Sequence, residues 1–131
     1  MPLVAVYGTL RDGMGNNGLM GDSEKLGEID VQGFEMYPAA PYGGFPVIFP
    51  VSPSEKTSHV IKAEVYQVSE ERLTGPLDRL EGHPTWYKRE LIPTPYGEAW
   101  IYVMQDERYK ENTKIESGDF VEFYYNLRGG L

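Results

Sequence analysis

Hydrophobic residues occur in short runs along this chain, and most runs end at a glycine or a proline. Residues 3–7, Leu-Val-Ala-Val-Tyr, are apolar throughout and precede Gly8, a pattern typical of a short buried strand. In residues 59–68, one parity consists of Ile61, Ala63, Val65 and Gln67 and is mostly apolar. This alternation predicts a second strand with at least one buried face.

Four further segments have the composition of strands or loops. Residues 25–36 predict one or two strands with a break at Gly33, and residues 42–53 predict a loop followed by a strand. Residues 87–92 and 99–104 predict two strands joined by a turn at Pro-Tyr-Gly. The segment 117–125 is compatible with either a short capped helix or a last strand.

One segment has the period of a helix. Ser69 is a good N-cap, and the two glutamates after it lie where the helix dipole favours negative charge. Gly82 is suited to end the helix. The Gly-Pro dipeptide at 75–76 interrupts it, so either one kinked helix or two short helices are expected. The apolar positions at helical spacing are Leu73, Leu77 and Leu80.

The composition favours a β-rich fold. The chain has 15 glycines, 10 prolines and 10 tyrosines, which suits short strands joined by many turns better than a helical bundle. Its 131 residues are the length of one domain. We therefore predict a single α+β domain over residues 1–131, most simply a small β-barrel with flanking short helices.

Charge and residue usage exclude several classes of function. The net charge is -8 and the densest basic stretch is Lys88-Arg89, so we do not expect nucleic-acid binding. The absence of cysteine excludes disulfides, thiolate metal sites and a cysteine nucleophile, and only two histidines are present, His59 and His83. No apolar stretch has the length of a signal peptide or membrane span. We expect a cytoplasmic protein without a metal, a cofactor or a membrane partner.

Residues 13–18, Gly-Met-Gly-Asn-Asn-Gly, match the spacing of the dinucleotide-binding fingerprint. That fingerprint requires a tight turn directly after a strand and a long helix behind it. Here the match begins six residues after Tyr7, and no long amphipathic helix follows. We interpret it as a chance match in a glycine-rich loop.

The segment Tyr7-Gly8-Thr9-Leu10 is the first candidate for chemistry. A glycine just past a buried strand permits a sharp turn and a close approach of a ligand to the backbone. The amides that follow can then bind an anion such as a carboxylate. The alternative is an ordinary turn at the end of a strand.

Glu81 is the second candidate. It lies four residues after Leu77, at the border of the apolar stripe and at the C-terminal end of the predicted helix. Desolvation and the helix dipole both raise a carboxylate pKa there, toward the range useful for acid/base catalysis. The alternative is a solvent-facing glutamate at a frayed helix end. Asp78 is expected either to pair with Glu81 or to be a surface acid facing Arg79 or Lys88.

Several segments resemble the gamma-glutamylcyclotransferase (AIG2-like) family over residues 3 to about 125. The start of the chain is similar to the family's opening strand and loop, and later segments are similar to its "G-E-V-Y" strand, with alanine for the usual glycine, and its "L-D-x-x-E-G…Y-x-R" block. The matching segments are residues 4–11, Gly27, 31–34, 63–66, 77–82, 87–89 and 99–103.

The resemblance implies a barrel with a cavity at its mouth and an intramolecular transfer. The α-amine of a γ-glutamyl substrate would attack the substrate's own γ-carbonyl and release pyroglutamate (5-oxoproline) and an amine. Glu81 matches the family's glutamate and would move the proton from the ammonium to the leaving nitrogen. The short chain and Thr9 look more like the gamma-glutamylamine branch of the family.

The resemblance also implies the substrate-binding residues. Backbone amides of the loop of Tyr7, Gly8, Thr9 and Leu10 would bind the substrate α-carboxylate. Two aromatic residues of the later strands, Tyr87 and Tyr102, would line the pocket. The implied partner is a small γ-glutamyl molecule. We expect the protein to be a monomer or a weak homodimer.

Two alternatives keep the fold and change the function. One is a non-catalytic module that binds a small molecule or a partner, and the other is a different γ-glutamyl or amide transfer on the same scaffold. Because a fold does not determine function, the residues of the site must distinguish between these hypotheses.

Overall fold

The centre of the molecule is a five-stranded sheet with the strand order β2-β5-β1-β7-β6. The computed structural model describes residues 1–39 and 44–127. β1 lies in the middle, antiparallel to β5 and parallel to β7, and the outer pairs β2–β5 and β6–β7 are antiparallel. The strands are β1 (Leu3–Val6), β2 (Glu24–Gln32), β5 (Val60–Gln67), β6 (Tyr87–Ile92) and β7 (Ala99–Met104).

A second sheet consists of the antiparallel pair β3 (Phe34–Pro38) and β4 (Pro46–Pro50). Gly33, with a φ of 94°, separates β2 from β3, as the sequence predicted. β3 contacts β5 and β4 contacts β7, so this pair lies against the central sheet. The strand expected within residues 42–53 is therefore present, although residues 42 and 43 lie outside the described part of the chain.

The α+β class is confirmed, but the closed barrel is not. Within residues 1–39 and 44–127, no strand pairing joins the edge strands β2 and β6, so the central sheet is open. Two of the strands, β3 and β4, pair with each other rather than closing that sheet. The period of the apolar residues fixes which segments become strands, but it does not fix which edges pair.

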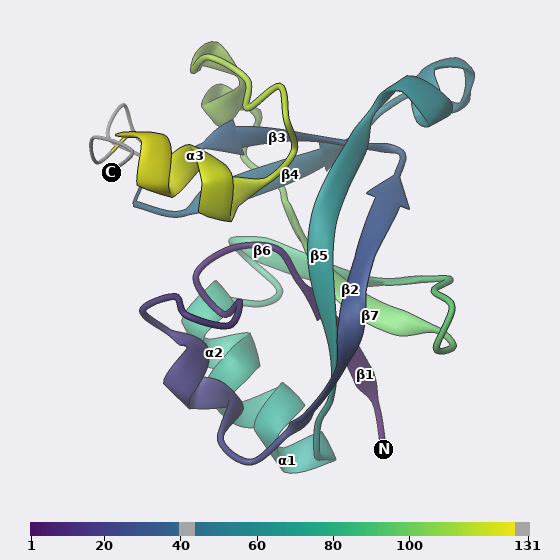
Figure 1. Cartoon of the computed structure of the whole chain (residues 1–131), viewed down its shortest axis with the longest axis vertical. Helices are drawn as coiled ribbons and strands as arrows, with labels where there is room; N and C mark the ends of the chain where they lie inside the picture. Colours follow the sequence, from purple (N-terminus) through teal and green to yellow (C-terminus); the bar gives the residue numbers. More distant parts are fainter. Residues whose placement is uncertain (40–43, 128–131) are drawn as a thin grey trace.

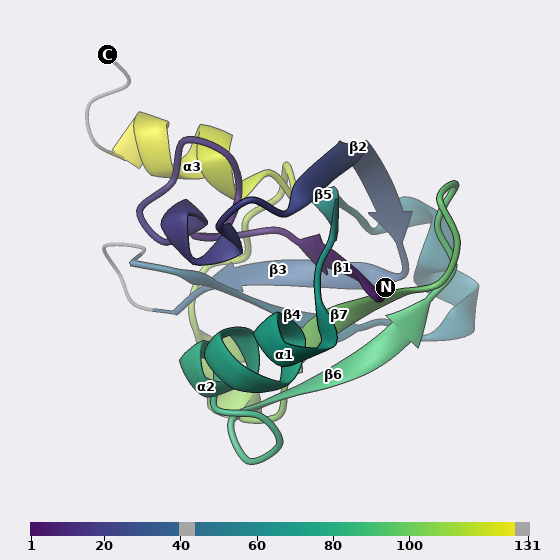
Figure 2. The ribbon, with the colours of Figure 1, turned by 90° about the horizontal axis from the view of Figure 1, so that it is seen from below.

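β1 is buried on both faces, which explains its continuous apolar sequence. Val4 and Val6 face a core cluster that includes Leu73 and Leu77 of the helical segment. Ala5 faces the other cluster, which includes Phe120. Figure 1 shows α1 and α2 at one end of the molecule and α3 with β3 and β4 at the other, and Figure 2 shows α1 and α2 in front when the molecule is seen from below.

The predicted helical segment is one continuous run with an irregular middle. α1 (Glu70–Arg72) leads into a π-helical turn η3 (Leu73–Leu77) that contains Pro76, and α2 (Asp78–Glu81) follows. Ser69 caps the start by accepting a hydrogen bond from the Arg72 amide, 3.1 Å long. Gly82 ends the run in the left-handed conformation, with a φ of 65°. The segment is therefore one continuous helical run rather than two separate helices, and its irregular turn lies at the Gly-Pro dipeptide.

The last segment is a helix rather than a strand, α3 (Phe120–Leu127). Asp119 accepts a hydrogen bond from the Glu122 amide, 3.2 Å long, and begins this helix. Short 3-10 helices lie in the connections between the described strands and helices: η1 (Asn17–Met20), η2 (Pro53–Ser58) and η4 (Glu107–Glu111). None of the helices in the described ranges is long and apolar enough to cross a membrane.

Candidate active site

A cavity of about 160 Å³ opens where β1 ends, between α2, β4 and the β6–β7 pair. A concave, mostly apolar site with a few polar groups is the usual form of a small-molecule pocket. All seven residues predicted from the sequence line it, although they come from four separate parts of the chain. They are Tyr7, Gly8, Thr9, Leu10, Glu81, Tyr87 and Tyr102. Their roles in binding or catalysis stay predictions at this point.

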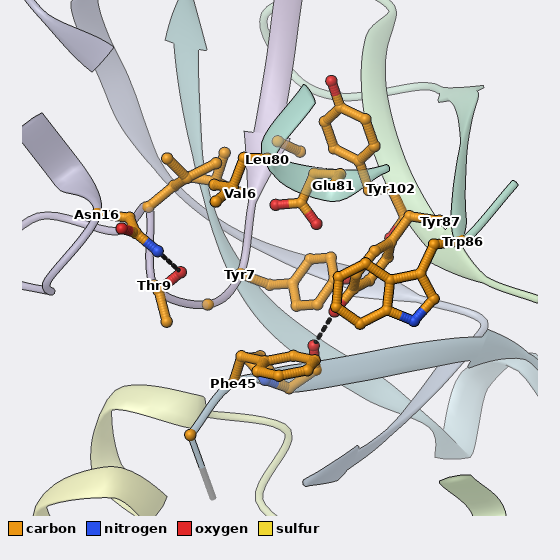
Figure 3. A pocket seen from close by; sticks show the side chains of 15 residues that line it. Val6, Tyr7, Thr9, Asn16, Phe45, Leu80, Glu81, Trp86, Tyr87 and Tyr102 are labelled. Atoms are coloured by element: carbon orange, nitrogen blue, oxygen red, sulfur yellow. Dashed lines mark hydrogen bonds between the residues drawn. The ribbon is translucent and has the colours of Figure 1, made fainter. Parts of the chain in front are cut away.

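Glu81 is the only charged residue among the described residues that line the cavity. Its carboxylate points into the open space between the β1 loop and the aromatic side chains (Figure 3). No hydrogen bond or ion pair to this carboxylate is found in the described part of the chain. Burial raises its pKa from 4.5 to about 7. A carboxyl group with these properties can both accept and donate a proton near neutral pH.

The raised pKa has a consequence for stability. A carboxyl group that ionises at about 7 when folded and at 4.5 when unfolded stabilises the fold below about pH 4.5 and loses that contribution as the pH rises through 7. We expect Glu81→Gln to gain stability relative to wild type on going from about pH 4 to about pH 8.5, by up to about 3 kcal/mol. Urea unfolding of both proteins at the two pH values measures this gain, and an equal difference at both would contradict it.

Three tyrosine hydroxyls of the site already donate to fixed protein acceptors. Tyr7 donates to the Tyr102 carbonyl at 2.6 Å, Tyr87 to the Pro46 carbonyl at 2.7 Å, and Tyr102 to Asp78 Oδ1 at 2.7 Å. Burial raises the pKa of all three phenols above the ordinary value of 10. They therefore stay neutral at physiological pH and do not compete with Glu81 as bases.

Asp78 takes neither of the two roles expected from the sequence. It accepts two hydrogen bonds from the Arg89 guanidinium, at 2.9 and 3.2 Å, and one from Tyr102. Burial opposes its ionisation, but these hydrogen bonds hold the pKa of Asp78 below its usual value. Arg89 also stacks on Trp100, with its central carbon 4.4 Å from the ring centroid. The pair thus fastens the one-turn helix α2, and with it Glu81, to β6 and β7.

We expect Asp78→Ala to lower kcat for a Glu81-dependent reaction by roughly 10- to 100-fold, because small displacements of a catalytic group have effects of that size. KM should change much less, since Asp78 does not line the cavity. The matched control is Arg79→Ala, which removes an exposed side chain of the same helix. Equal effects of the two substitutions on kcat would contradict a positioning role.

The loop after β1 is shaped by its neighbours. A Cβ at Gly8 would lie 2.6 Å from Cδ of Pro46, so the glycine is required by a close approach of β4. Asn16 donates to Thr9 through its backbone amide, at 2.9 Å, and through its side chain, at 2.9 Å. The amides of Thr9 and Leu10 find no acceptor within the described residues, so they are available to a bound anion.

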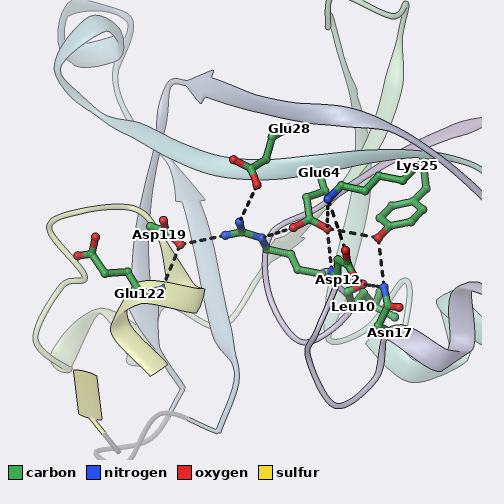
Figure 4. A network of polar contacts seen from close by, with 10 residues as sticks. Leu10, Asp12, Asn17, Lys25, Glu28, Glu64, Asp119 and Glu122 are labelled. Carbon is green, nitrogen blue, oxygen red and sulfur yellow. Dashed lines mark hydrogen bonds and ion pairs between the residues drawn. The ribbon is translucent and has the colours of Figure 1, made fainter. Parts of the chain in front are cut away.

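A buried ion-pair network anchors this loop from behind (Figure 4). Arg11, which is 4% exposed, contacts Glu64 at 2.9 Å, Asp119 at 3.0 Å and Glu28 at 3.6 Å. The other oxygen of Glu64 accepts a hydrogen bond from the Asp12 amide, 2.8 Å long. The loop is thereby fixed to β2, β5 and the start of α3.

The local sequence pattern predicts neither this network nor the place of Phe45 in the cavity. One signal was available for Glu64, because a charged residue on a strand that is buried on both faces requires a buried partner. Phe45 carried no comparable signal. It lines the cavity because β4 passes beneath the loop after β1.

Comparison with known proteins identifies the family and supports this description of the fold. Residues 4–122 match the family model described as gamma-glutamyl cyclotransferase, AIG2-like. The gamma-glutamylcyclotransferase family protein YtfP of Escherichia coli (strain K12) is 36% identical over 120 residues, which cover 91% of this chain and 96% of YtfP.

Solved structures agree with the sequence match. The crystal structure of the uncharacterized protein PH0828 from Pyrococcus horikoshii has a TM-score of 0.74 at 25% identity and covers 98% of each chain. The solution structure of YtfP from Escherichia coli has a TM-score of 0.69 at 32% identity, covering 92% of this chain and 97% of that one. With a family model matched over most of its length, the chain belongs to the gamma-glutamyl cyclotransferase, AIG2-like family.

Proposed function

We propose that this protein releases pyroglutamate and a free amine from a γ-glutamylamine-type substrate, with Glu81 as the general acid and base. The observation that carries the proposal is the state of Glu81, a half-buried carboxyl group with a pKa of about 7 and an open cavity in front of it. Membership of the family supports a cyclotransferase in general terms. The role of Glu81 and the class of leaving amine are the parts we propose.

The chemistry needs one group that moves a proton. Glu81 as carboxylate takes a proton from the substrate α-ammonium, and the free amine attacks the γ-carbonyl carbon to form the five-membered lactam ring. The bond from that carbon to the leaving nitrogen then breaks as Glu81 returns the proton to this nitrogen. The nitrogen of the new ring gives up a second proton, which Glu81, again a carboxylate, accepts and passes to the released amine, so that the amine leaves as its ammonium. No water, electron or second substrate enters the balance. A group with a pKa near neutrality performs these transfers efficiently.

The loop after β1 supplies the complementary binding element. The amides of Thr9 and Leu10 lack acceptors within the described residues, and both residues line the cavity. They would bind the substrate α-carboxylate, which places the neighbouring α-ammonium toward Glu81. The hydroxyls of Tyr7 and Tyr87 donate to backbone carbonyls, so they offer only lone pairs, which suits an ammonium group.

The test is pyroglutamate release from γ-glutamyl-ε-lysine, other γ-glutamylamines and glutathione. We expect release from one or more of the γ-glutamylamines and weaker release from glutathione. Release from none of them would overturn the proposed reaction and leave a binding module as the better reading. Comparable or stronger release from glutathione would overturn the γ-glutamylamine assignment alone.

A further inference from the structure

The cavity has two chemically different sides. On one side are Thr9 and Asn16, which are hydrogen-bonded to each other, and on the other are the aromatic rings of Phe45, Trp86 and Tyr87. The Glu81 carboxylate lies between the two sides (Figure 3). A substrate that lies across Glu81 with its α-carboxylate on the Thr9 side therefore projects its leaving amine toward the aromatic side.

The aromatic side of the cavity consists of rings that pack against one another. Phe45 and Trp86 meet edge to face with their centroids 5.4 Å apart, and Trp86 meets Tyr87 in the same way at 5.2 Å. Tyr87 is held in turn by its hydrogen bond to the Pro46 carbonyl. We refer to Phe45, Trp86 and Tyr87 as the aromatic wall.

Trp86 is held in place although it is 37% exposed. Its amide donates to the Gly82 carbonyl at 2.9 Å, and its own carbonyl accepts from the Gln105 amide at 3.3 Å. A Cβ at Gly82 would lie 3.0 Å from Cβ of Trp86, so the glycine that ends α2 also admits the tryptophan. A large, fixed and partly exposed apolar surface at a cavity mouth is typical of a surface that binds a ligand.

The charge of the cavity lining also affects which leaving groups can bind. No lysine, arginine or histidine is among the described residues that line the cavity, and Glu81 is the one charged group there. A leaving group with a carboxylate beside the scissile nitrogen would meet a like charge and no compensating cation, which disfavours its binding.

We infer that the aromatic wall selects the leaving group, and that the preferred substrates are γ-glutamyl amides of apolar amines without a carboxylate next to the scissile nitrogen. This inference rests on the proposed function, because it assigns the leaving amine to the aromatic side. Trp86 and Phe45 become specificity-determining residues, a role separate from the proton transfer by Glu81.

Three matched substrates test the inference. γ-Glutamylphenethylamide carries an apolar body, γ-glutamylphenylalanine adds only a carboxylate to it, and γ-glutamylmethylamide lacks the apolar body. We expect kcat/KM for the phenethylamide to exceed each of the others by about 10-fold or more, from burial of the phenyl ring in one comparison and from charge repulsion in the other. Equal values for the phenethylamide and the methylamide, or a preference for γ-glutamylphenylalanine, would overturn the inference.

Substitutions test whether the aromatic wall causes the preference for the phenethylamide. Trp86→Ala should reduce the phenethylamide-to-methylamide ratio of kcat/KM to about 1, and Trp86→Phe should retain most of it. Tyr125→Ala is the matched control, because it removes an aromatic residue that is 52% exposed and lies outside the cavity. A ratio that Trp86→Ala leaves unchanged would overturn the role of the wall.

A binding measurement separates this inference from the proposed reaction. Calorimetry on the Glu81→Gln protein, which leaves the wall in place, should show about 10-fold tighter binding of the phenethylamide than of the methylamide. If no substrate is turned over but this difference in affinity is present and Trp86→Ala removes it, the proposed reaction is rejected. The role of the aromatic wall in binding the leaving group is then supported. If pyroglutamate is released but the two amides bind equally, the role of the aromatic wall is rejected and the proposed reaction is retained.

Discussion

Replacing Glu81 by glutamine should lower kcat for pyroglutamate release by roughly 100- to 10,000-fold, the usual contribution of a general acid/base. Glutamine has nearly the same shape but neither accepts the proton of the substrate ammonium nor returns it to the leaving nitrogen. In the described residues lining the cavity, no other group ionises near neutral pH, because burial keeps Tyr7, Tyr87 and Tyr102 neutral. A neighbour therefore cannot take over the proton transfer.

The matched control for this substitution is Glu90→Gln, which makes the same chemical change at an exposed position of β6. Both proteins should give the circular dichroism spectrum of the wild type, and only the Glu81 variant should lose activity. Activity within about threefold of wild type in a folded Glu81→Gln protein would be too small an effect for a general acid/base and would remove Glu81 from the mechanism.

Replacing Arg11 by methionine should destabilise the protein by about 3–5 kcal/mol, the range observed when one partner of a buried ion pair is removed. Methionine retains much of the apolar stem of the side chain but leaves Glu64, which is 2% exposed, with its charge uncompensated by the guanidinium. Lys25, 3.8 Å from Glu64, offers only a longer and partly exposed contact. Urea unfolding measures the loss as a lower midpoint.

A surface pair provides the comparison for Arg11. Lys62 and Asp30 are 2.9 Å apart, but their side chains are 36% and 63% exposed. Lys62→Met should therefore change the free energy of unfolding by less than about 1 kcal/mol. Similar losses for Arg11→Met and Lys62→Met would show that the buried network does not anchor the loop after β1.

The sequence predicted the separate elements of the site better than the contacts between them. The apolar run before Gly8 and the helical leucines before Glu81 identify a strand end and a helix end, and both features are local. The central sheet then brings the two ends to one cavity, because Val4 and Val6 of β1 pack in the same core cluster as Leu77.

The contacts that hold the site depend on register and could not be read from local pattern. Arg11 and Glu64 are 53 positions apart, and they meet because β1 and β5 pair with Val6 opposite Glu64. The same holds for Asp78, whose partner Arg89 comes from β6 rather than from its own helix. Shifting a strand by one residue turns its side chains to the other face, so these pairs require the three-dimensional pairing.

The measurement that tests the role of Glu81 most directly is the pH dependence of kcat/KM for pyroglutamate release, from about pH 5 to about pH 9. The reaction needs Glu81 as carboxylate, so the expected result is a plateau above the pKa of about 7 and a tenfold loss for each pH unit below it. An acid limb near 4.5, the ordinary pKa of a glutamate, or no acid limb at all, would contradict the assignment of Glu81 as the acid/base.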